Sequence, residues 1–286
     1  MSNGDVGTQA LTWRLPKSRA ERLYNELRYA VSRTDSETLS RWALQSLKLF
    51  GAAVVRRLKG LGALVKKLLE MLVREATETH RAVRAGNLRH HAARKGQELL
   101  EKLQRTGGEV SESAKALVQR IADNPREAAP QLLAGVLGFY LGSGGLDANG
   151  GIPDTDIAVG GIGSHRSVFT HSILTGAALE AGIFSLVLLA NVVHANLPEQ
   201  HDEFWDRLVA ETNRLAVAFA AGACAGLAYH LLADSSWQAG KAYTDLPFTM
   251  PMEGHQLVMG ASAVAEAVRA EQVASAPARA SMRKRS

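Results

Sequence analysis

The sequence predicts an all-α protein, a helical bundle with a His/Asp cluster at one end and a basic helical region before it. Three observations favour this fold class: Ala, Leu and Gly dominate the composition, apolar residues recur at steps of three and four, and period-two alternation is scarce. With 286 residues, of which 46% are hydrophobic, the chain suffices for one large domain or two smaller ones. The single cysteine, Cys224, excludes a disulfide framework and a thiolate zinc site.

Charge divides the chain into segments. Residues 1–130 contain 24 Lys/Arg and 14 Asp/Glu, residues 131–268 contain 4 and 13, and the remainder is basic again. Such a division suggests separate roles for the segments. Four parts are therefore predicted: a disordered start (1–16), a basic helical N-terminal region (17–130), a helical core (131–268) and a disordered basic tail (269–286).

The basic region is expected to consist of helices. The first begins near Ser18 and ends at the polar segment TDSET, where Ser36 and Thr38 are candidate caps of the next helix. Further polar helices are expected up to residue 128, broken at RTGG (105–108) and DNP (123–125).

The second helix of this region is amphipathic. Its apolar stripe comprises Leu47, Phe50, Val54, Leu58, Leu61, Val65, Leu68 and Leu72. Its other face carries Lys48, Arg56, Arg57, Lys59, Lys66, Lys67 and Arg74. This pattern is typical of a helix packed on its neighbours with solvated charges, and also of a basic helix lying on an anionic membrane surface.

Four apolar segments follow Pro125: residues 131–146, 173–197, 215–233 and 256–268. The second is long enough to span a bilayer although Glu180 and His194 interrupt it, and the third has no full charge. Because Ala and Gly make all four weakly hydrophobic, they are either membrane spans or buried helices of a soluble bundle. If they span, both basic ends should face the cytoplasm, which requires an even number of spans.

Histidine and aspartate residues gather at the ends of these apolar segments. They are Asp154, Asp156, His165, His171, His230 and Asp234. His230 and Asp234 are four residues apart and therefore share one helix face. Imidazole suits zinc, iron or nickel, and carboxylates also admit magnesium or manganese. Since buried ionisable groups are costly unless they are paired or bind a cation, the pattern predicts one or two divalent ions, with zinc the first expectation.

Each of these residues also has a structural role open to it. His171 with Ser172 could cap a helix, and Asp154 could shape a turn after Pro153. His230 could be a hydrogen-bonded core histidine.

Four motifs, in this order, resemble the YdjM-like family: PDTDI, HRSVFTHS, GLAYHLLADSSWQAG and GHQLVMG. The family consists of LexA-regulated or related bacterial inner-membrane proteins that are predicted to be metal-dependent hydrolases. Its pattern is a PD-x-DH loop, an HRG-x-THS segment, and H-x3-D followed by a polar run and Gly. The resemblance covers about residues 131–268, and Ile157 stands where the family has a histidine. It implies a hydrolase in the bacterial inner membrane; a soluble cytoplasmic protein is the alternative.

The leading hypothesis is metal-dependent hydrolysis of a phosphoester, with a membrane lipid as one candidate substrate. Asp156 is expected to be a ligand or the general base, and Arg166 to hold a phosphate oxygen or to pair with an aspartate. Thr170 and Ser172 are expected to orient the imidazoles, and His255 to lie within reach of the site. The expected metal ligands are His165, His171, His230, Asp234 and Asp154.

Two other function classes stay open. A membrane-associated structural or effector protein would work through its basic amphipathic helices and would use the His/Asp cluster as a non-catalytic metal site. A metal-dependent nuclease or nucleic-acid binder would use the basic region, although that region has no aromatic-interleaved patch or recognisable binding motif.

Overall fold

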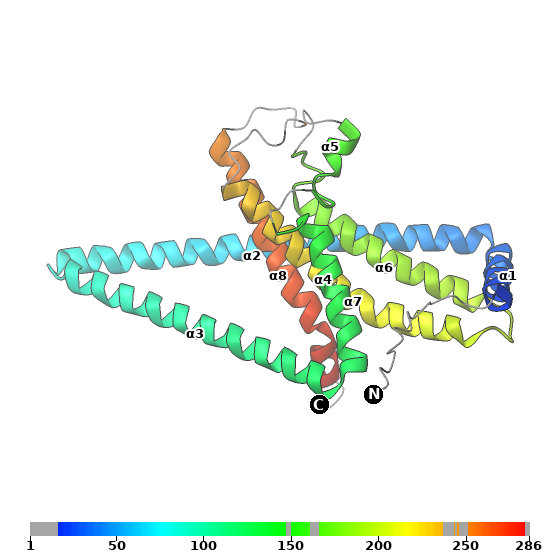
Figure 1. Cartoon of the computed structure of the whole chain (residues 1–286). Helices are drawn as coiled ribbons and strands as arrows, with labels where there is room; N and C mark the ends of the chain where they lie inside the picture. The colour runs from blue at the N-terminus through cyan, green and yellow to red at the C-terminus, as the bar shows by residue number, and fades with distance from the viewer. Residues whose placement is uncertain are drawn as a thin grey trace, which may run out of the picture.

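The computed structural model is all-α, which confirms the predicted fold class (Figure 1). It describes residues 17–146, 150–160, 166–236, 243, 245 and 251–283, and these ranges contain no strand. The helices are α1 (Lys17–Arg33), α2 (Ser36–Arg84), α3 (Leu88–Asp123), α4 (Pro125–Ser143), α5 (Thr155–Gly160), α6 (Ile173–Ala195), α7 (Glu203–Ser236) and α8 (Met252–Arg283). The predicted disorder of residues 1–16 lies outside the described residues.

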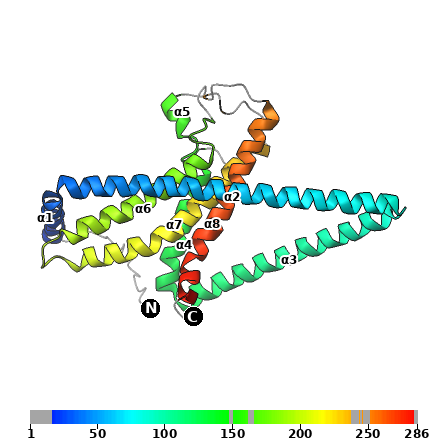
Figure 2. The ribbon, with the colours of Figure 1, turned by 180° about the vertical axis from the view of Figure 1, so that it is seen from behind.

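Helices α2 and α3 form a long hairpin. They meet at one tip and diverge from it, so that most of the hairpin lies away from the other helices (Figures 1 and 2). The cap of α2 is Asp35, which precedes both predicted caps; its carboxylate accepts a hydrogen bond from the N–H of Thr38 at 2.7 Å. The tip turns at Gly86, whose φ of 70° suits glycine.

Helix α3 continues through residues 105–108, where the sequence predicts a break. Two interior glycines cost about 1 kcal/mol each relative to alanine. The segment has no proline, and the long runs of helix-forming residues on both sides offset this cost. The predicted break at DNP does occur, because Pro125 takes the first position of α4, where its missing N–H is not needed.

The face of α2 that packs on the core differs from the predicted apolar stripe. The indole N–H of Trp42 donates to the carbonyl of Ser185 on α6 at 2.9 Å, and Ala53 is fully buried. Four members of the stripe are instead more than half exposed: Leu47 (67%), Leu58 (53%), Val65 (52%) and Leu72 (60%). Phe50, Val54 and Leu61 of the stripe are half-buried, so the packing face of α2 overlaps the predicted stripe only in part.

Arg57, which the sequence places on the solvated basic face, is fully buried. Its guanidinium pairs with Glu266 of α8 at 2.9 Å and with Glu180 of α6 at 2.8 Å. Arg56 and Arg269 also pair with Glu180, at 2.8 and 2.9 Å. Three arginines from α2 and α8 thus surround the Glu180 carboxylate of α6, and the basic region is tied into the core.

Helices α4 and α7 approach each other closely through glycine. A Cβ added to Gly138 or Gly142 of α4 would collide with the backbone of α7, and one added to Gly222 or Gly226 would collide with the backbone of α4. Side chains at these positions would force the helices apart. The C-terminal ends of α4 and α7 and the starts of α6 and α8 come together near α5, at one end of the bundle (Figure 1).

Helix α8 continues to Arg283, whereas the sequence predicts disorder from residue 269. Arg269 is held by its ion pair with Glu180, and the following residues are rich in alanine, the best helix former. Among the described residues, two helices are long and apolar enough to cross a membrane, α6 and α7. Helix α6 covers the second predicted apolar segment except its last two residues, and α7 contains the third.

Candidate metal centre

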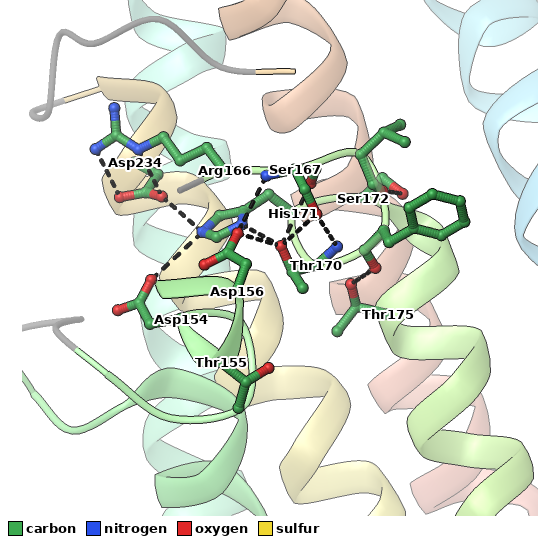
Figure 3. Close-up of polar contacts among 12 residues, drawn as sticks. Asp154, Thr155, Asp156, Arg166, Ser167, Thr170, His171, Ser172, Thr175 and Asp234 are labelled. Atoms are coloured by element: carbon green, nitrogen blue, oxygen red, sulfur yellow. Dashed lines mark hydrogen bonds and ion pairs between the residues drawn. The ribbon is translucent and has the colours of Figure 1, made fainter. Parts of the chain in front are cut away.

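The predicted His/Asp cluster lies at the end of the bundle beside α5 (Figure 3). Asp154 comes from the loop between α4 and α5, and Asp156 from the first turn of α5. His171 directly precedes Ser172, the cap of α6, while His230 and Asp234 lie one turn apart on α7. The cluster therefore combines residues from three separate parts of the chain.

Four donor atoms approach one another in this cluster. His171 Nε2 lies 3.3 Å from His230 Nε2, 3.5 Å from Asp154 Oδ1 and 3.3 Å from Asp234 Oδ2. His230 Nε2 lies 3.6 Å from Asp154 Oδ1 and 3.7 Å from Asp234 Oδ2. The two Nε2 atoms therefore form a triangle with Asp154 Oδ1 and a second triangle with Asp234 Oδ2. Both triangles include the pair of imidazole nitrogens.

The size of these triangles matches zinc coordination. Donors about 2.1 Å from a tetrahedral metal lie about 3.4 Å from one another. The measured separations run from 3.3 to 3.7 Å. A divalent ion can thus contact either set of two imidazoles and one carboxylate with shifts of a few tenths of an ångström.

Hydrogen bonds decide which nitrogen of each ring faces the cluster. His230 Nδ1 lies 3.0 Å from the Ser143 carbonyl, which can only accept, so this nitrogen carries the proton. The Thr170 hydroxyl donates to Asp156 Oδ2 at 2.6 Å and can therefore accept from His171 Nδ1 at 2.9 Å. In their neutral forms both rings then direct the Nε2 lone pair into the cluster.

The electrostatics of the cluster favour a cation. Burial opposes a charge on His171, but the carboxylates of Asp154 and Asp234 outweigh it and raise the pKa of this histidine above its usual value. Lone pairs of two imidazoles and two carboxylates that converge in a buried site repel one another unless a proton or a metal lies among them. A proton on His171 meets this need in part, and a divalent ion would compete with it.

Asp156, the expected ligand or general base, lies behind the ring of His171. Its Oδ2 lies 3.5 Å from His171 Nδ1, on the outer side of the ring, and accepts from the backbone N–H of Ser167 at 3.1 Å and from Thr170. A carboxylate behind a ligating histidine fixes the ring and raises its basicity. Asp156 thus orients His171 instead of facing the shared Nε2 atoms.

Arg166 pairs with an aspartate, which is one of the two roles expected for it. Its Nε and Nη2 lie 3.2 and 3.3 Å from the two carboxylate oxygens of Asp234. Its backbone adopts φ of 65°, which is rare for a residue with a side chain, and its carbonyl accepts from the N–H of Tyr243 at 2.8 Å. The buried guanidinium holds Asp234 toward the imidazole of His171 (Figure 3).

Of the residues predicted to orient the imidazoles, Thr170 contacts His171 whereas Ser172 does not. The Ser172 hydroxyl accepts from the N–H of Leu174 and caps α6, which is the structural role that the sequence left open. His255 is buried and its ring lies 5.7 Å from that of Tyr243, measured between centroids. His165 lies outside the described residues.

Tyr243 is a component of the site that the sequence does not predict. It is 2% exposed, and its hydroxyl donates to the carbonyl of His171 at 2.8 Å. Together with its backbone contact to Arg166, this links the loop before α8 to both sides of the cluster. An aromatic residue in a loop carries no periodic signal, so only the tertiary structure identifies it.

No family model, curated protein or solved structure matches this chain. The likeness to YdjM-like proteins therefore rests on the motifs alone.

Proposed function

We propose that this protein is a metal-dependent hydrolase that acts on phosphoesters. One observation carries the proposal: the buried His171 and His230 rings, each held through Nδ1, face each other through Nε2 at 3.3 Å between two carboxylates. Among the residues that the structure describes, three groups of His, Asp or Glu could hold a metal ion, and this group is the most buried of the three. Zinc fits its imidazole and carboxylate donors and their spacing.

The residues around the cluster have separable tasks in this proposal. His171, His230 and the neighbouring carboxylates would hold a divalent ion, whose Lewis acidity would serve to activate water and to polarise a phosphoryl oxygen. Asp156 and Thr170 hold His171 in its ligating tautomer, and Arg166 holds Asp234. The guanidinium also places positive charge beside the cluster, which favours an anionic substrate.

Access to the cluster is proposed from the loop before α5. The Asp154 side chain is 11% exposed, whereas those of His171, His230 and Asp234 are 0 to 2% exposed. A metal site with protein ligands on one side and solvent on the other leaves a position for water or substrate, as catalytic zinc sites do. Asp154 is thus the ligand nearest to an incoming phosphoester.

The test uses purified full-length protein without an affinity tag. His230→Asn should abolish bound zinc and cleavage of bis(p-nitrophenyl) phosphate while the helical circular-dichroism signal persists, because one of two shared imidazole donors is lost. His80→Asn, at an exposed position of α2, is the matched control and should retain both. A His230→Asn protein that still cleaves the diester at the wild-type rate would disprove the proposal.

A membrane location belongs to the same proposal. The two helices of suitable length and composition, α6 and α7, support association with the bacterial inner membrane, with a lipid phosphoester as substrate. If so, the protein should remain in the membrane pellet after alkaline carbonate extraction and should cleave phosphatidic acid presented in mixed micelles. Release into the supernatant would instead favour the soluble cytoplasmic alternative.

The exposed apolar residues of α2 favour a second candidate function, that of a membrane-associated effector. Leu58, Val65 and Leu72 are exposed on the same helix as Lys59, Lys66 and Lys67, all of which are also exposed. Basic and apolar residues together bind anionic bilayers. This candidate expects Lys59, Lys66 and Lys67 to be essential in cells when exchanged for Glu, and His230→Asn to be silent; the hydrolase expects the reverse.

A further inference from the structure

A second cluster of metal-ligating side chains lies at the turn between α6 and α7. His194, in the last turn of α6, places Nε2 2.8 Å from Asp206 Oδ1, in the first turn of α7. His201, in the connecting turn, places its own Nε2 3.1 Å from the same oxygen. The three ligand atoms lie within 4.8 Å of one another.

The tautomer of His201 shows that this arrangement accommodates a cation. Its Nδ1 lies 2.8 Å from the Pro198 carbonyl, which only accepts, so Nδ1 carries a proton. In the neutral ring, Nε2 then presents a lone pair to a carboxylate oxygen at hydrogen-bond distance. Two acceptors in this position require a shared cation, either a second proton on the ring or a metal.

We propose that His194, His201 and Asp206 form a second metal site, which takes a divalent transition-metal ion such as Ni²⁺ or Zn²⁺ in octahedral coordination completed by water. Adjacent donors of an octahedron, each about 2.1 Å from the metal, lie about 3.0 Å apart. The two separations to Asp206 Oδ1, 2.8 and 3.1 Å, bracket this value. They are shorter than those of the buried cluster, which match a tetrahedron.

The partial exposure of the site agrees with water as the remaining ligand. The side chains of His194, His201 and Asp206 are 31%, 19% and 59% exposed. Imidazole with carboxylate is a donor set that nickel, copper and zinc accept. The site is also far from the first cluster, because α6 has 23 residues and its two ends are about 33 Å apart.

A metal at this turn would stabilise the docking of α1. Asp202, in the same turn, pairs with Arg19 of α1 at 2.8 Å. Glu26 of α1 accepts from the indole N–H of Trp205 at 2.8 Å and from the Asp202 N–H at 3.1 Å. Asp202 lies between His194 and His201 on one side and Asp206 on the other in the sequence. A bound ion would therefore hold the turn in the conformation that contacts α1.

The experiment is an isothermal titration of the tag-free, metal-depleted full chain with Ni²⁺, followed by hydrogen–deuterium exchange. The wild type should show two classes of site. The double variant His194→Asn/His201→Asn should lose the class that belongs to the α6–α7 turn and keep the class of the buried cluster. His171→Asn should lose only the class of the buried cluster. Ni²⁺ should slow amide exchange in residues 196–206 and in α1 of the wild type but not of the double variant. His80→Asn again serves as the matched control.

Two results would overturn the inference: a double variant that binds as many Ni²⁺ ions as the wild type with equal affinity, or a wild type that shows no class beyond the one removed by His171→Asn. Asp206→Asn gives a second test that leaves both imidazoles in place, and it should weaken the same class by at least an order of magnitude. Failure here leaves the diester-cleavage test untouched, because that test depends on His230.

Discussion

The two halves of α2 carry similar charges in very different surroundings. In the half that crosses the core, Arg57 pairs with Glu180 and Glu266, and all three side chains are at most 2% exposed. In the half that extends into the hairpin with α3, Lys66 and Glu70 lie 3.9 Å apart and are 78% and 66% exposed. Water solvates the second pair in the folded and unfolded states alike, whereas the first has lost its hydration. A basic residue paired with glutamate therefore fixes helix packing in the core half of α2, whereas in the other half such a pair lies in solvent and contributes little to stability.

The largest effect is expected at the buried pair. Arg57→Leu leaves Glu266 buried without its partner, and the free energy of unfolding should fall by about 3–5 kcal/mol. Urea denaturation followed by circular dichroism measures this. The double variant Arg57→Leu/Glu266→Leu should recover part of the loss, because no unpaired charge remains. If Arg57→Leu were as stable as the wild type, the buried pair would contribute no more to stability than the exposed pair in the other half of α2.

A smaller effect, on zinc affinity, is expected from the hydrogen bond between Thr170 and His171. Thr170→Val removes the oxygen that holds His171 Nδ1 and should weaken zinc binding about 10–100-fold. Competition with a chromophoric chelator measures the affinity. Thr77→Val is the hairpin counterpart, since the Thr77 hydroxyl bonds only to the Val73 carbonyl of its own helix among the described residues, and zinc affinity should stay unchanged.

The contact between α1 and the α6–α7 turn should depend on pH in the acid range. The hydrogen bond from Arg19, with that from the Phe204 N–H, lowers the pKa of Asp202 to about 2. A carboxyl whose pKa is lower in the folded state stabilises it above the unfolded value of about 3.9, and this contribution disappears as the pH falls toward the folded value. The protection factors of the α1 amides, which correct for the intrinsic pH dependence of exchange, should therefore fall between about pH 4 and pH 2. Arg19→Gln should flatten this dependence; an unchanged profile would show that the ion pair does not hold α1.

The smallest effect is expected on the hairpin. Lys66→Ala removes a single exposed ion pair and should change the free energy of unfolding by less than about 0.5 kcal/mol. The same urea titration provides the value. A loss comparable to that of Arg57→Leu would mean that the hairpin is packed against a partner in solution.

Part of the candidate site could be predicted from sequence. His230 and Asp234 share a helix face at a spacing of four, and the position of His171 before an apolar segment places it at a helix start. The relation between these two parts could not be predicted, because it depends on how α6 packs against α7. The role of Asp156 was also out of reach, since one residue of rotation along α5 decides whether it faces Nε2 or Nδ1 of His171.

The basic region shows where periodicity misleads. The strongest apolar stripe in the chain belongs to α2, yet Leu47 and Leu72 are exposed while Arg57 is buried. A stripe predicts which face prefers an apolar neighbour, but it does not supply that neighbour. For Arg57, the neighbours are Glu180 of α6 and Glu266 of α8, and their carboxylates make its burial favourable.

The sequence by itself determined the all-α class, the starts of α1, α4 and α6, and the gathering of His and Asp residues at helix ends, because these depend on spacing, caps and residue identity within a single segment. Tertiary structure alone decided which charges are buried, which nitrogen of each histidine points inward, and that Tyr243 and the Ser143 carbonyl belong to the site. Those properties depend on groups contributed by other helices, and no local pattern in the chain encodes their distance or direction.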